Sequence, residues 1–192
     1  MRRYNASACP MAYLRNSGAW PPESAHACCL SDLDELIAAA RPRSMLLMLP
    51  DGFGGVEAGP DGGPGGIELR VPTGPDRPLK RYDVAVLFRV VERLGREPAQ
   101  RLIASLRDLH AERLYVVVGG SCEGEPCVSE WTDGDLFALG MRLQQSYSDA
   151  PAGGTGETLR LFSFSLSDYK TTPEWLNSNY WANPELFGKF RW

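Results

Sequence analysis

The chain has 192 residues, a formal net charge of −4 and a charged fraction of 23%. A chain of this length forms one domain of ordinary size and buries roughly two-thirds of its unfolded surface. The nearly balanced charge argues against an electrostatic grip on nucleic acid or anionic lipid. No apolar run is long enough to span a bilayer, and no signal-peptide pattern follows Arg2 and Arg3. These features together predict a cytoplasmic protein that does not bind membranes.

The N-terminal region is predicted to be a poorly ordered arm. Residues 1–22 have no hydrophobic period and contain several Gly, Pro and Asn residues typical of irregular chain. A first helix is predicted over 31–41, with Ser31 as its N-cap and Asp34 approximating a capping box. Its apolar face comprises Leu33, Leu36, Ile37 and Ala40, and Pro42 ends it.

The first predicted strand, residues 44–49, is apolar on both faces, which is typical of a strand buried in a parallel sheet. Residues 51–66 then contain eight Gly and two Pro. Because each Gly costs a helix about 1 kcal/mol and each Pro about 3 kcal/mol, this stretch is predicted to be a loop. Residues 67–71 form a short strand that we expect near an edge of the sheet.

The central unit of the chain is predicted to be strand, helix and strand. Residues 82–88 are apolar and rich in Val, and residues 114–118 form a second such run. Between them Pro98 suits the first turn of a helix, and one helical stripe comprises Leu102, Ile103, Leu106 and Leu109. Parallel strands need a crossover of this kind, so the sequence predicts a mostly parallel sheet.

The chain beyond the central unit is predicted to add a helix and an antiparallel strand pair. Thr132 or Asp133 caps a short helix that continues to Leu139, and Gly140 ends it. Residues 141–147 and 158–166 alternate in polarity and are joined by a short Gly-rich loop, which favours antiparallel pairing.

The C-terminal extension, residues 167–192, is rich in aromatic side chains. Nine of the nineteen aromatic residues lie from Phe162 onward, and two Pro-containing caps predict two short helices. The extension either covers an exposed part of the sheet or forms a contact surface for a protein or small-molecule partner. The aromatic residues of that second interpretation are Trp175, Tyr180, Trp181 and Trp192. Few basic residues accompany them, which argues against nucleic acid.

The five cysteines are spaced irregularly, which predicts reduced thiols. A zinc site from His26, Cys28, Cys29, Cys122 and Cys127 has poor ligand spacing. The run His110-Ala111-Glu112 followed by Pro126-Cys127 is similar to the zinc deaminase signature, but Glu130 replaces its second cysteine. The sequence therefore predicts no metal site.

Residues 82–94, Tyr-Asp-Val-Ala-Val-Leu-Phe-Arg-Val-Val-Glu-Arg-Leu, resemble the fourth strand of class I S-adenosylmethionine-dependent methyltransferases and the segment after it. The resemblance covers about residues 31–166 and implies a Rossmann-like α/β domain, expected here over 23–166. It implies that Asp51, Gly52, Gly54 and Glu92 border the cofactor, with Asp76 or Glu68 as a stand-in acid. The aromatic ending also resembles that of a bacterial family of unknown function.

Three departures from the family pattern concern the cofactor half. The Gly52-x-Gly54 turn is a weak motif alone, no ordinary helix can follow it, and the second strand ends in Val71-Pro72 instead of an acid. Because affinity comes from a preformed site with a few placed polar groups, we expect a non-catalytic binding or scaffold module without cofactor. An active methyltransferase with an altered S-adenosylmethionine pocket is the alternative.

Overall fold

The computed structural model describes residues 24–50, 67–70, 80–120, 127–149, 158–169 and 189. The predicted N-terminal arm, the Gly-rich stretch after residue 50 and almost all of the aromatic extension lie outside these residues. Within the described residues, no helix is long and apolar enough to cross a membrane.

A six-stranded sheet forms the middle layer, in the order β2-β1-β3-β4-β6-β5. The strands β2, β1, β3 and β4 are parallel, and β6 is antiparallel to both β4 and β5. Their bounds are β1 Met45–Met48, β2 Ile67–Arg70, β3 Tyr82–Phe88, β4 Ala111–Gly119, β5 Arg142–Ser148 and β6 Thr158–Ser165. The predicted mostly parallel sheet and its antiparallel C-terminal pair are thus confirmed, as is the position of β2 at an edge.

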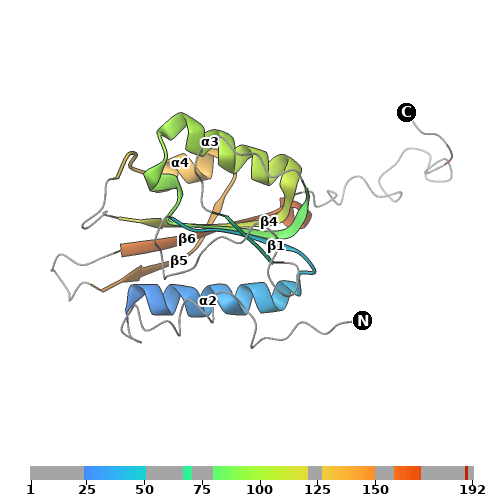
Figure 1. The fold of residues 1–192 in the computed structure, drawn as a ribbon, viewed down its shortest axis with the longest axis horizontal. Coiled ribbons are helices and arrows are strands. Elements are labelled where there is room, and N and C mark those ends of the chain that lie inside the picture. The colour runs from blue at the N-terminus through green and yellow to red at the C-terminus, as the bar shows by residue number, and fades with distance from the viewer. Residues whose placement is uncertain are drawn as a thin grey trace, which may run out of the picture.

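Helices cover both faces of the sheet (Figure 1). Helix α2, Ala25–Ala40, lies on one face, and α3, Arg96–Ser105, and α4, Asp133–Ala138, lie on the other. Each face has its own apolar core, and the strands separate the two. The remaining elements are the short helices η3 Val91–Arg93, η4 Leu106–His110 and α5 Leu166–Tyr169. Helix α5 was not predicted.

Helix α2 begins six residues earlier than the sequence predicted. Its N-cap is Ser24, whose hydroxyl accepts a hydrogen bond from the Ala27 N–H at 3.2 Å. Ser31 lies inside the helix instead of capping it. The additional first turns bury Ala25, Cys29 and Leu30, which extends the predicted apolar face and explains why the helix continues to Ser24.

The stripe predicted for the crossover helix is wrong at its last position. Ile103 and Leu106 are fully buried, but Leu109 is 63% exposed. The chain changes at Leu106 from α-helix to the π-helical turn η4. A π-turn holds more residues than an α-turn, so Leu109 is rotated off the face on which Leu106 lies.

Helix α4 and its ends follow the prediction closely. Thr132 is the N-cap and forms a reciprocal capping box with Asp135. Gly140 has φ +78°, the left-handed conformation in which glycine ends helices without strain.

The prediction of reduced thiols is wrong at Cys127, which is disulfide-bonded, whereas Cys28 and Cys29 are free. Irregular spacing of five cysteines argues against a disulfide framework, but it does not exclude a single bond. Cys29 is fully buried in the core beneath the sheet, and burial raises the pKa of its thiol to about 12.

Candidate functional site

The order of the strands places a topological switch point between β1 and β3. From β1 the chain passes to β2 on one side of it, and then returns to β3 and β4 on the other side. Open α/β sheets bind ligands in the crevice outside the carboxyl ends of the strands at such a point. The candidate site is therefore the carboxyl edge of β1, β3 and β4.

Glu92 follows β3 at this edge, but its carboxylate points into the protein. The side chain is 2% exposed, and Oε1 accepts a hydrogen bond from the N–H of Gly119, at the end of β4. Oε2 is buried and has no hydrogen-bond partner in the described part of the chain. Burial raises the pKa of Glu92, although the Gly119 N–H and the Arg89 charge oppose this change.

The main chain of Glu92 is also held in place, by the loop that precedes α4. The carbonyl oxygen of Glu92 accepts hydrogen bonds from the N–H groups of Val128, at 2.8 Å, and Ser129, at 3.1 Å. The Ser129 hydroxyl and the Trp131 indole N–H both donate to the Val91 carbonyl. The main chain around Glu92 is therefore held in place, and the side chain could turn toward the crevice only by giving up its hydrogen bond to the Gly119 N–H.

Arg89 stands directly after β3 in a left-handed backbone conformation, with φ 53°. Such a conformation is uncommon for a residue other than glycine and costs of order 1 kcal/mol. The Arg89 guanidinium lies against Gly119, where an added Cβ would come within 2.9 Å of Nη2. Glycine at position 119 is therefore needed for this close approach.

His26, from the first turn of α2, completes a group that we call the edge cluster: His26, Arg89 and Glu92. The His26 Nε2 lies 3.5 Å from Nη1 of Arg89, and the ring is tilted against Phe88 at 6.2 Å between centroids. Burial, followed by the positive charge of Arg89, lowers the pKa of His26 to about 4. His26 is therefore neutral near pH 7.

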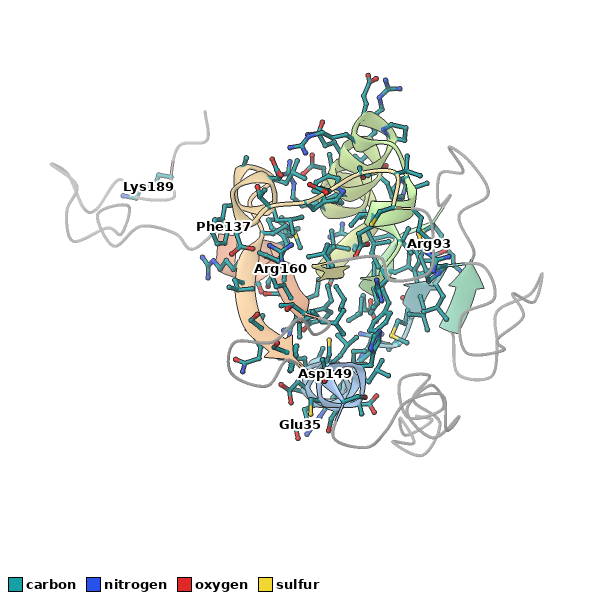
Figure 2. All side chains as sticks on the ribbon, turned by 90° about the vertical axis from the view of Figure 1, so that its left-hand side faces the viewer. Glu35, Arg93, Phe137, Asp149, Arg160 and Lys189 are labelled. Carbon is teal, nitrogen blue, oxygen red and sulfur yellow. The ribbon has the colours of Figure 1, made fainter. Side chains whose placement is uncertain are left out.

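Asp149, which directly follows β5, links the end of that strand to helix α2. Its carboxylate accepts a hydrogen bond from the N–H of Ala25 in the first turn of α2, and Figure 2 shows it beside that helix. A carboxylate at this position meets the unsatisfied N–H groups of a helix N-terminus. It also opposes the fall in the His26 pKa.

The structure locates one of the four residues predicted to border a cofactor. Glu92 lies at the predicted edge, but it faces inward. Asp51, Gly52 and Gly54 lie outside the described residues. The sequence assigned no role to Arg89, and considered His26 only as a metal ligand. Arg89 could have been recognised from the sequence, because it is a charged residue directly after a buried parallel strand.

The structure also locates some of the residues that were weighed as metal ligands. Among the described residues, no group of three or more His, Cys, Asp or Glu side chains could hold a metal ion. The His110 Nδ1 lies 3.2 Å from the carbonyl oxygen of Lys80. The Gly119 N–H donates a hydrogen bond to the Glu92 carboxylate, and the Gly120 N–H donates one to the Thr158 carbonyl. Both N–H groups are therefore already bonded within the protein.

Solved structures similar to this chain include three methyltransferases. The methyltransferase domain of bacterial-CtHen1-CN is 14% identical, with 73% of this chain and 100% of that one covered and a TM-score of 0.49. The 1,6-didemethyltoxoflavin-N1-methyltransferase of Burkholderia thailandensis, with bound 1,6-didemethyltoxoflavin and S-adenosylhomocysteine, is 14% identical, with 86% of this chain and 93% of that one covered and a TM-score of 0.48. N-methyltransferase NodS of Bradyrhizobium japonicum WM9, with S-adenosylhomocysteine, is 12% identical, with 83% and 98% covered and a TM-score of 0.47. No curated protein matches the sequence.

The order and directions of the strands define an α/β domain of the Rossmann-like class. Within that class, the chain belongs to a family of unknown function, DUF6231, whose model matches residues 28–192. The match includes the aromatic extension. The resemblance of the sequence to a family of unknown function is thereby confirmed.

Proposed function

We propose that this chain is a non-catalytic binding or scaffold module built on a methyltransferase-like fold. The observation that carries the proposal is the enclosure of Glu92, whose carboxylate bonds the Gly119 N–H inside the protein. An acidic residue that contacts a ribose or transfers a proton must present an oxygen to the ligand at hydrogen-bond distance. Glu92 instead joins η3 to the end of β4.

The other two members of the edge cluster support the same proposal. A general base works best when its pKa lies near the working pH, whereas the pKa of His26 is lowered to about 4 and its side chain is 3% exposed. The guanidinium of Arg89 lies against Gly119 and next to His26. These polar groups mainly hold the carboxyl edge together.

An active S-adenosylmethionine-dependent methyltransferase with an altered pocket is the second candidate. The observation that favours it is the switch point between β1 and β3, where α/β sheets commonly bind ligands. In this case Asp51, Gly52 and Gly54 would contact the cofactor. Glu92 would stabilise the carboxyl ends of β3 and β4 from inside the protein.

Calorimetric titration of the full chain with S-adenosylmethionine, and separately with S-adenosylhomocysteine, tests the proposal. We expect no binding in the micromolar range, because the second strand lacks the expected acid and the carboxylate of Glu92 is enclosed. Micromolar binding of either compound would overturn the proposal and favour the second candidate.

Variants then test whether any binding occurs at the switch point. For the second candidate, Asp51→Ala and Gly54→Val should each weaken binding at least tenfold. Asp61→Ala, from the same Gly-rich stretch, is the matched control and should bind as the unchanged chain does. Equal affinity in all three variants would exclude this edge as the site.

A further inference from the structure

Gly119 lies where strand β4 extends past the end of its neighbour β3. The last pair between the two strands is Phe88 with Val117, two residues before Gly119. The Gly119 N–H therefore has no carbonyl of β3 to bond, and it donates instead to Oε1 of Glu92. A backbone donor beyond the end of a ladder needs an acceptor of some kind, and here that acceptor is a carboxylate.

The guanidinium of Arg89 lies at the same residue. A Cβ added to Gly119 would come within 2.9 Å of Nη2 and 3.2 Å of Cζ and Nε of Arg89. The positive charge of Arg89 also opposes the rise in the pKa of Glu92. A backbone N–H and a guanidinium close to one point are the groups that bind carboxylates by charge-assisted hydrogen bonds.

The Glu92 carboxyl group fills this position only in part. Its side chain is 2% exposed, and Oε2 is buried without a hydrogen-bond partner in the described part of the chain. Buried polar atoms of proteins are bonded in the large majority of cases, so the contact between Glu92 and Gly119 is incomplete. The main chain of Glu92 is held separately, by the N–H groups of Val128 and Ser129. Its side chain can therefore be removed while those bonds remain.

We propose that the Gly119 N–H and the Arg89 guanidinium form a binding site for one carboxylate group, and that Glu92 closes this site to small organic acids by acting as a built-in ligand. The contact is autoinhibitory, because a tethered carboxylate is present at a high effective concentration and a free acid competes poorly with it. The site is independent of S-adenosylmethionine, since it requires only a carboxylate.

Rescue of Glu92→Ala by acetate tests this proposal in the full chain. The substitution removes a –CH2–COO⁻ group, which is the size of acetate. We expect about 100 mM acetate near neutral pH to raise the Tm of this variant by roughly 3–5 °C more than the same concentration of chloride does. Propionate should raise it less, because its additional methylene must fit into a closely packed interior.

Glu92→Gln is the matched control, because its amide oxygen can still accept the Gly119 hydrogen bond and keep the site closed. In this variant and in the unchanged chain, acetate should have no more effect than chloride. Adding Arg89→Gln to Glu92→Ala should abolish most of the acetate effect. In ¹H–¹⁵N spectra, the Gly119 amide signal should move with acetate in Glu92→Ala and stay in place in Glu92→Gln.

Each alternative result decides the proposal. Equal stabilisation of all the variants by acetate would overturn it, because that is a general effect of the salt. A Gly119 signal that moves with acetate in the unchanged chain would also overturn it, since Glu92 would not then close the site. If Glu92→Ala is largely unfolded in chloride, acetate should restore the folded signal, and a failure to restore it would count against the site.

Discussion

Glu92 makes the stability of the protein depend on pH in a direction opposite to that of most carboxylates. Its pKa is raised by burial, so the folded state holds the proton more tightly than the unfolded state does. The stability that this provides is present below the ordinary carboxyl pKa and is lost as pH rises through the folded pKa. Above the folded pKa, burying the ionised form therefore lowers the stability.

Glu92→Gln tests this interpretation. The amide oxygen can still accept the Gly119 hydrogen bond, and no charge is buried. We expect the variant to be more stable than the unchanged chain by about 1 kcal/mol at pH values above the folded pKa of Glu92, with the difference disappearing in acid. Urea unfolding at several pH values measures it. A variant that is less stable at every pH would mean that attraction between Glu92 and Arg89 outweighs the cost of burial.

His26 acts in the other pH direction. Its pKa falls from 6.5 in the unfolded chain to about 4 in the folded one, because it is buried and faces Arg89, while Asp149 only partly compensates. As pH falls from about 6.5 to about 4, His26 becomes protonated in the unfolded state but stays neutral in the folded state, so the free energy of unfolding decreases. The loss reaches at most about 3 kcal/mol for a shift of this size.

The corresponding comparison is His26→Gln, which cannot titrate. Between about pH 7 and about pH 4 we expect the free energy of unfolding to fall less steeply in this variant than in the unchanged chain. Urea unfolding across that range measures both slopes. Parallel slopes would show that His26 titrates normally and that other groups cause the acid sensitivity.

Among the elements, helix α2 shows where local sequence signals were ambiguous. Ser24 and Ser31 are both residues that can cap a helix, and packing decides between them, because the first turns bury Ala25 and Cys29. We expect Ser24→Ala to cost about 1 kcal/mol through the lost cap. Ser31→Ala, inside the helix, should stay within about 0.5 kcal/mol. Urea unfolding of the two variants distinguishes them, and the reverse order would favour the shorter predicted helix.

The strands could be predicted because each is a continuous apolar or alternating run. Residues 82–88 were located without error, since both faces of β3 are buried. The exposure of Leu109 could not be predicted, because a stripe of period 3.6 assumes that the helix stays α-helical, and η4 does not. The position of Glu92 followed from its motif, but its inward orientation depends on Gly119, which is 27 residues away.

At the scale of the whole molecule, the sheet predicts a gradient of local stability. Strand β4 lies between β3 and β6 and is paired along most of its length, whereas β5 and β2 end the sheet in the described residues. Interior residues of β4 such as Val116 and Val117 are fully buried, but five consecutive residues of β5 are exposed. Local opening costs least where few buried contacts must be broken.

Amide hydrogen exchange measures this gradient directly. We expect the slowest exchange in residues 114–118, where opening requires unfolding of the whole sheet, and much faster exchange in β5 between Arg142 and Ser146. The Val116 amide provides the internal reference for global unfolding. Exchange in β5 as slow as in β4 would contradict an open edge.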